Sequence, residues 1–171
     1  MGVCVAAFYY VMNLRETNNN RKITATINLM QSLSTPEFYE LGKELMNMRW
    51  SDFEDYRRKY DYTVNYENFT ARMLIWDKYD IIGLLLKRGL IDIETLNSVA
   101  SQPLTLRWMI FKPIIDEYRK FSYGKDAFSN WEYAAYELAK YKIKRDPTWK
   151  FNNESFTPEM FDKTFNMSEI R

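Results

Sequence analysis

The sequence predicts an all-α fold: a single helical bundle domain of five to seven helices with a long N-terminal helix. Three observations support this prediction. Apolar residues recur at helical spacing along most of the 171 residues, and no run of five or more residues alternates cleanly between apolar and polar side chains. Helix-start sequences, in which a capping side chain is followed within three residues by an acid, recur between the apolar rows. A hydrophobic content of 46% is enough for one core.

The expected helices follow from these patterns. The first runs from the apolar N-terminus to about residue 33, because Ile23, Ile27, Met30 and Leu33 form a helical row. Later helices are expected at about 36–48, 53–60, 66–88, 92–100, 103–121 and 129–145, starting at sequences that include Thr35-Pro36-Glu37, Ser51-Asp52-Phe53-Glu54, Asn65, Asp92 and Ser129-Asn130-Trp131-Glu132. The segment 92–121 is divided in two because proline is favoured near a helix start, which places Pro103 at the beginning of a new helix. Gly89 is expected to end the central helix as a left-handed cap.

The chain is expected to contain one helical domain, residues 15–150, followed by a loosely packed tail, residues 151–171. Residues 1–14 are interpreted as the remnant of a membrane anchor or as the start of the first helix. These 14 residues carry no charge, so every charged residue lies beyond them. They would reach about 21 Å as a helix, against about 30 Å of bilayer hydrocarbon.

The residues around the end of this apolar segment favour a membrane anchor. Tyr9 and Tyr10 are followed by Arg15, Arg21 and Lys22, which is the order expected where a helix leaves a membrane into the cytoplasm. The preferred interpretation is a truncated or upstream-extended membrane helix with the domain on the cytoplasmic side. The alternative is the buried first helix of a soluble protein.

The composition excludes several functional classes. There are 24 Lys+Arg and 23 Asp+Glu residues, so a net charge of +1 offers no general attraction to nucleic acid. The absence of histidine and the presence of a single cysteine exclude His-based catalysis, zinc clusters and an internal disulfide. Five glycines form no phosphate-binding loop motif. The sequence therefore assigns no catalytic residue, cofactor site or metal site.

One carboxylate in the central helix lies on an apolar arc. Asp80 shares that arc with Trp76 and has no basic residue three or four positions away. A buried carboxylate needs a partner, and Arg107 and Arg119 on a later helix are the candidates for a buried ion pair. The alternative interpretation is a catalytic or binding carboxylate.

Two tryptophans and a basic run are candidates for an interface. Trp50 and Trp149 lie at helix ends, where tryptophan is less readily explained by core packing. Lys140 and Lys144 belong to a basic run at the end of the last helix, which is either a solvated helix terminus or a contact for anionic lipid headgroups.

An ordered series of segments within residues 5–148 resembles a known group of proteins. The segments are YYVMNLRETNNNRKIT, QSLSTPEFYEL, WDKYDIIGLLLKRGLID, WMIFKPIIDEYRK and KIKRDP. They resemble small uncharacterised proteins of archaea and bacteria that are described as hypothetical membrane proteins with a domain of unknown function. The resemblance implies an N-terminal membrane helix followed by a cytosolic helical domain, and it implies no activity or ligand.

The function expected from the sequence is that of a membrane-tethered cytosolic interaction or scaffold module, which associates with a membrane and with a protein partner or itself. Nucleic acid is not an expected partner, and an enzyme is the less favoured class. One alternative is a carboxylate-based, metal-assisted hydrolase using Asp77, Asp80 and Glu94. Another is a soluble helical regulator that dimerises through its first helix.

Overall fold

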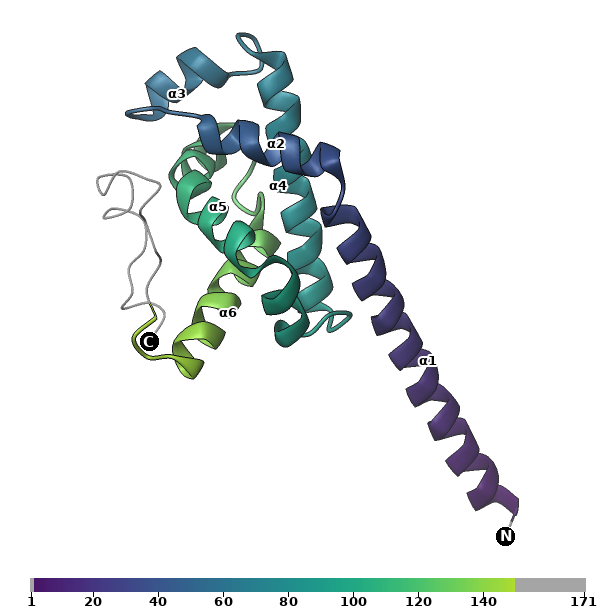
Figure 1. Cartoon of the computed structure of the whole chain (residues 1–171). Helices are drawn as coiled ribbons and strands as arrows, with labels where there is room; N and C mark the ends of the chain where they lie inside the picture. Colours follow the sequence, from purple (N-terminus) through teal and green to yellow (C-terminus); the bar gives the residue numbers. More distant parts are fainter. Residues whose placement is uncertain (1, 150–171) are drawn as a thin grey trace.

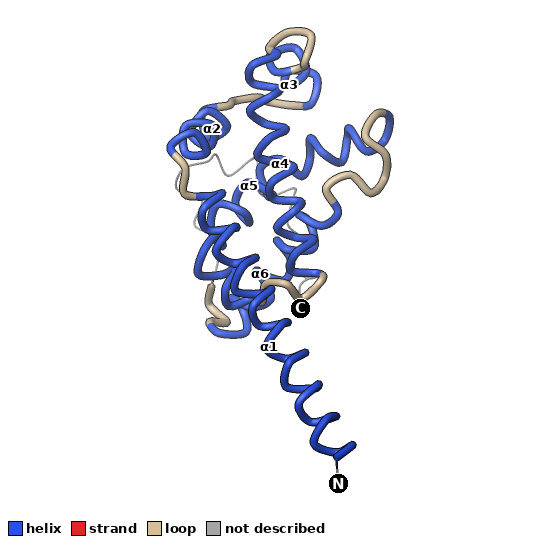
Figure 2. Tube along the Cα trace, turned by 90° about the vertical axis from the view of Figure 1, so that its right-hand side faces the viewer, coloured by secondary structure: helices blue, strands red, loops and turns tan. Residues whose placement is uncertain are grey.

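The computed structural model describes residues 2–149, and it confirms the all-α fold with a long N-terminal helix (Figure 1). The helices are α1 (Gly2–Leu33), α2 (Pro36–Asn47), α3 (Phe53–Tyr60), α4 (Tyr66–Lys87), α5 (Ile93–Phe121) and α6 (Ser129–Arg145). Figure 2 shows helices joined by loops, with no strand in the described part of the chain. The expected tail, residues 151–171, lies outside the described residues.

Four helices begin where a side chain caps them. The capping side chains of α2, α3, α4 and α5 each accept a hydrogen bond from the backbone N–H three residues later, and they are Thr35, Asp52, Asn65 and Asp92. Each such cap contributes about 1 kcal/mol to the stability of a helix, because the first turn otherwise leaves backbone N–H groups without partners. These caps explain why the predicted starts of these helices are close to the observed ones.

Helix α4 is the centre of the bundle and packs against α2, α3, α5 and α6. Trp76 of α4 is fully buried together with Trp108 of α5 and Trp131 of α6. The ring centroids of Trp108 and Trp131 lie 5.1 Å apart in an edge-to-face arrangement, and the Trp131 indole N–H donates to the Leu104 carbonyl at 3.0 Å. Aromatic pairs of this kind contribute about 0.5–1.5 kcal/mol beyond the burial of their area.

Helices α4 and α6 are in close backbone contact at Gly83. A Cβ atom at this position would lie 1.9 Å from the carbonyl oxygen of Asn130, at the start of α6. Only glycine allows this backbone contact. The contact places the first turn of α6 directly beside the middle of α4.

The prediction of two helices between residues 92 and 121 is wrong, because α5 continues through Pro103. Four side chains at successive i+4 positions form one buried row across the proline: Leu96, Ala100, Leu104 and Trp108. Packing of this row against the core outweighs the hydrogen bond that proline cannot donate, which makes the helix continuous.

Helix α1 enters the core through its C-terminal turns. Leu29 and Leu33 are buried in the core, whereas Ile23, Ile27 and Met30 are 48–57% exposed. The predicted continuation of the first helix to about residue 33 is confirmed, and of the row that predicted it only Leu33 is buried. The N-terminal part of α1 projects beyond the other helices in both views (Figures 1 and 2).

Candidate functional site

The N-terminal arm, defined as residues 2–14 of α1, extends beyond the bundle (Figure 1). Every residue from Val5 to Leu14 is exposed, so this segment takes no part in the core. Its large apolar side chains are 46–69% exposed and comprise Val5, Phe8, Tyr9, Tyr10, Val11, Met12 and Leu14. Contiguous exposed apolar surface of this kind marks an interaction site in a soluble or membrane-associated protein.

The predicted transmembrane helix is not found. Within residues 2–149, no helix combines the length with the apolar content that a membrane crossing requires. The arm measures roughly 20 Å at 1.5 Å per residue. Charged residues begin at Arg15, directly after the arm.

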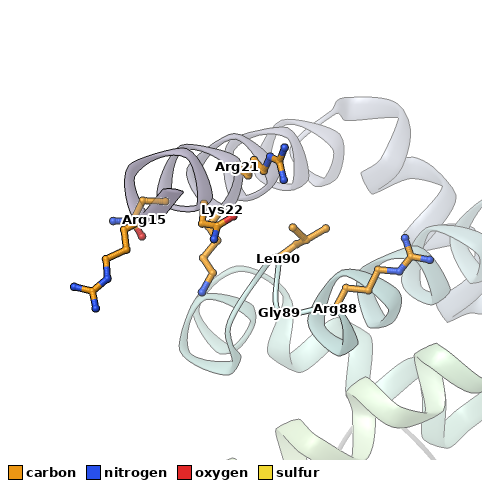
Figure 3. Close-up of a pocket in the computed structure, with 8 residues that line it drawn as sticks. Arg15, Arg21, Lys22, Arg88, Gly89 and Leu90 are labelled. Carbon is orange, nitrogen blue, oxygen red and sulfur yellow. The ribbon is translucent and has the colours of Figure 1, made fainter. Parts of the chain in front are cut away.

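A basic hollow lies at the base of the arm, between α1 and the turn after α4 (Figure 3). Its volume is about 490 Å³, and it is lined by Arg15, Asn18, Asn19, Arg21, Lys22, Arg88, Gly89 and Leu90. Figure 3 shows Lys22 extending from α1 toward the turn, with Leu90 facing α1 from the opposite side. The hollow thus combines residues that are far apart in the sequence.

The turn that closes the hollow is built around Gly89. This residue has φ +66°, a left-handed conformation that glycine adopts without strain. The Leu90 N–H donates to the Leu85 carbonyl and the Gly89 N–H to the Leu86 carbonyl, which completes a Schellman-type end of α4. The predicted left-handed cap at Gly89 is confirmed, and it leaves Arg88 beside α1.

The hollow is electrostatically positive. Within residues 2–149, none of its four cations, Arg15, Arg21, Lys22 and Arg88, forms an ion pair within 4.0 Å. One carboxylate lies within electrostatic reach: the pKa of Asp92 is lowered mainly by hydrogen bonds from Thr95, and the charge of Lys22 lowers it further. None of the eight residues that line the hollow is acidic.

The structure corrects the predicted partner of Asp80. Its Oδ1 accepts hydrogen bonds from the backbone N–H groups of Asn130 and Trp131, each at 3.0 Å, and its Oδ2 accepts one from the Asn130 side chain at 2.9 Å. Asp80 thus caps the start of α6 from another helix. Phe128 at the N-cap position makes no side-chain capping bond, so the predicted cap from Ser129 is replaced by this tertiary one.

Arg107 and Arg119 do not pair with Asp80. The Arg107 Nη1 donates to the Tyr79 hydroxyl, and burial raises the pKa of Tyr79 while the guanidinium opposes that shift. The Arg119 Nη2 lies 2.9 Å from the Glu132 Oε2, and its Nη1 lies 3.2 Å from the Asp116 Oδ1. Each arginine thus ties α5 to a neighbouring element without Asp80.

The predicted interface residues lie in different settings. Trp50 is half-buried and packs against the rings of Tyr56, Tyr60 and Phe111 at centroid distances of 5.2–6.4 Å, so it belongs to the edge of the core. The Lys142 Nζ lies 5.2 Å from the ring centroid of half-buried Trp149.

The two lysines of this group are exposed at the end of α6. Lys140 pairs with Glu137 on its own helix at 3.0 Å, and Lys144 lies one turn further along. The structure brings neither lysine to the arm nor to the basic hollow.

The acids expected for a metal-assisted hydrolase are not brought together. Asp77 is exposed on α4, Asp80 is occupied by the start of α6, and Glu94 lies on α5, where it accepts from the Tyr141 hydroxyl at 3.4 Å. No group of three or more metal-ligating side chains occurs among residues 2–149.

Sequence reasoning missed a fully buried arginine. The Arg72 guanidinium donates to the Tyr60 carbonyl at 3.1 Å and to the Asn68 Oδ1 at 3.2 Å, and the Asn68 amide donates in turn to Glu44 at 2.9 Å. The rings of Tyr56 and other aromatic residues surround it at 5.1–5.4 Å. Its position four residues before buried Trp76 was the available signal, since both lie on the same side of α4.

Together, the fold and the site define a helical bundle that carries an exposed apolar arm with a basic hollow at its base. The chain belongs to the family described as a domain of unknown function, DUF4760, whose model matches residues 1–138. The predicted resemblance to a domain of unknown function is therefore confirmed. Comparisons with curated proteins and with solved structures return no match.

Proposed function

We propose that this protein is a membrane-attached helical module whose arm enters the apolar layer of a membrane from one side. The observation that carries the proposal is the exposure of every residue from Val5 to Leu14 in the uncharged arm, which extends beyond the other helices in Figure 1. An apolar side chain of valine, leucine, phenylalanine or methionine gains about 1.5–3 kcal/mol when it is fully removed from water. The arm has five such side chains, and each is between 46% and 69% exposed, so each can gain only part of this free energy. Insertion of the arm should therefore gain on the order of 5 kcal/mol.

The residues that follow the arm support attachment to the cytoplasmic face. Arg15, Arg21 and Lys22 occupy the base of the arm, where they would meet the headgroups of the leaflet that the arm enters. Basic residues are enriched at the cytoplasmic ends of membrane segments, and anionic lipids of that leaflet attract them. Tyr9 and Tyr10 carry hydroxyls that suit the interface between headgroups and hydrocarbon.

The role of the bundle in this proposal is protein interaction, and a second copy of the chain is the proposed partner. Ile23, Ile27 and Met30 form an exposed apolar row on α1 beyond the basic hollow. Attachment through the arm would orient α1 in the same way in every copy and raise the local concentration, so equivalent rows could pair with two-fold symmetry. Sedimentation of the full chain in neutral micelles should show a dimer that Ile27→Asp converts to a monomer; a monomer in both would exclude this pairing.

Vesicle flotation tests the membrane proposal. The full chain should float with neutral phosphatidylcholine vesicles, and the double variant Phe8→Asp/Val11→Asp should stay at the bottom of the gradient, because two carboxylates cannot enter the apolar layer. Both replaced side chains are exposed, so the variant should melt at the wild-type temperature.

A matched control is available on the loop before α4. Tyr62 and Val64 are 60% and 61% exposed, so Tyr62→Asp/Val64→Asp adds the same charge to an exposed aromatic and an exposed valine outside the arm. This control should float like the wild type. If the wild type fails to float, or if both double variants lose flotation equally, the arm is not the membrane attachment.

A further inference from the structure

Four cations from two separate elements line one hollow with little compensating charge. Arg15, Arg21 and Lys22 come from α1, whereas Arg88 comes from the end of α4 (Figure 3). The volume of about 490 Å³ lies within the roughly 300–1,000 Å³ that is usual for ligand sites. Asn18 and Asn19 add amide groups that can donate hydrogen bonds. The chemistry of this lining is that of an anion site.

The nature of the cations favours phosphate over other anions. A guanidinium presents a planar set of N–H donors that matches two oxygens of a phosphate group at once, and a lysine adds a point charge. Arg88 alone is explained by the favourable position of a cation at the C-terminus of α4. That effect does not account for the three further cations on α1, which also line the hollow and lie in the middle of that helix.

The position of the hollow indicates where the phosphate would come from. Leu14 ends the arm and Arg15 begins the lining, so the hollow lies at the depth of the headgroups when the arm is inside the apolar layer. Phospholipid headgroups place their phosphates at that depth, next to the apolar side chain of Leu90. A free phosphate would have to reach the same cations from water.

We propose that the basic hollow binds the phosphate of an anionic phospholipid headgroup, with a preference for a phosphate monoester. The preference follows from charge: a monoester carries about −1.5 to −2 at neutral pH, which matches several cations better than a diester with a single charge. This inference rests on the proposed insertion of the arm. It names the class of lipid that the basic hollow would select once the arm is inserted.

Partition of the full chain into vesicles of three compositions tests the inference. The vesicles contain phosphatidylcholine alone, phosphatidylcholine with phosphatidylserine, or phosphatidylcholine with an equal fraction of phosphatidic acid. The wild type should partition most strongly into the last. Arg88→Gln should reduce that partition constant about fivefold, equivalent to about 1 kcal/mol for one cation near a charged surface, and should leave binding to pure phosphatidylcholine unchanged.

The remaining variants distinguish phosphate binding at the basic hollow from a general effect of the protein's net charge. Lys22→Gln, on the other wall of the hollow, should show the same selective loss as Arg88→Gln. Lys43→Gln removes an exposed lysine that pairs with Glu40 on α2 at 3.6 Å, and it should behave like the wild type. A loss that is equal for Lys43→Gln and Arg88→Gln would reduce the effect to net charge and would overturn the site.

The other outcomes distinguish this inference from the proposed function. If the wild type binds all three vesicles equally, or Arg88→Gln keeps the preference for phosphatidic acid, the hollow does not select phosphate although the arm still attaches. If no vesicle is bound, the proposed function fails first. Inorganic phosphate is the probe for a free ligand: if it raises the melting temperature of the wild type but not of Arg88→Gln, and vesicles show no preference, the ligand is soluble phosphate and the lipid assignment is wrong.

Discussion

Replacing Asp80 by alanine should be among the most destabilising single changes on α4. The substitution removes one carboxylate that accepts three hydrogen bonds, two from the backbone N–H groups of Asn130 and Trp131 and one from the Asn130 side chain. The side-chain amide can turn to water, whereas the two backbone groups at the start of α6 remain without a partner. A buried N–H left unpaired costs about 1–3 kcal/mol, so the two together give about 4 kcal/mol.

The substitution of Asp80 by asparagine separates the hydrogen bonds from the charge. An asparagine carbonyl can still accept from both backbone groups, and Asn130 can rotate its amide to restore the third bond. The loss is then mainly the attraction between a negative charge and the positive end of a helix, about 1 kcal/mol. Asp77→Asn is the matched control one turn away, because the Asp77 side chain is exposed. Partial desolvation of its carboxyl group, and secondly the negative charge of Asp80, raise the pKa of Asp77.

Urea unfolding followed by far-UV circular dichroism measures these differences. The expected order of stability is Asp77→Asn close to wild type, then Asp80→Asn, then Asp80→Ala, with equal slopes for all four proteins. Equal stabilities of Asp80→Ala and Asp77→Asn would refute the capping of α6 by α4. An Asp80→Asn variant as unstable as Asp80→Ala would instead show that the charge, and not the hydrogen bonds, holds the two helices together.

Three further outcomes are expected. Gly83→Ala should lower the free energy of unfolding by about 3 kcal/mol or more in urea titration, because its methyl group would meet the Asn130 carbonyl; a variant of wild-type stability would contradict that contact. The Lys59 ammonium is the main cause that lowers the pKa of Asp55 from 3.8 to about 2, so this part of the stability is present above pH 3.8 and is lost as the pH falls through about 2. Acid titration should therefore show a shallower loss in Asp55→Asn than in the wild type, and identical acid profiles would exclude this ion pair. Deletion of residues 2–14 should leave a folded domain whose melting temperature changes by less than about 2 °C, since Val5 to Leu14 are all exposed; unfolding on deletion would make the arm part of the core.

The helix boundaries could largely be predicted from the sequence because their causes are local. Thr35, Asp52, Asn65 and Asp92 each cap a helix through a residue three positions away, so the relevant interaction is contained in the local sequence. Gly89 likewise ends α4 through bonds to its own last turn. Such interactions depend little on what other helices do.

The errors arose where another helix decides the outcome. Pro103 interrupts hydrogen bonding locally, yet the buried row on both sides of it keeps α5 continuous. Asp80 finds its partner on α6 and not among the arginines of α5, because the backbone N–H groups of a helix start are as good a partner for a carboxylate as a guanidinium is. Sequence spacing contains no information about this choice.

The candidate site likewise has one part that local sequence determines and one part that depends on another helix. The uncharged arm and the three cations after it are contiguous, so the sequence alone identifies them. Arg88 joins them only because the Gly89 turn brings the end of α4 beside α1, and that contact depends on the packing of Leu29 and Leu33. The fourth cation of the hollow therefore requires the tertiary structure.

The depth of the arm in a bilayer tests the central claim most directly. A fluorophore placed at Val11→Cys, in a chain whose Cys4 is replaced by alanine, is compared with one at Ile27→Cys in the presence of vesicles with brominated acyl chains. Both positions are exposed on α1, but they lie on opposite sides of the basic hollow along the helix. Insertion of the arm predicts strong quenching at position 11 and little at position 27, whereas equal or absent quenching at the two positions would contradict it.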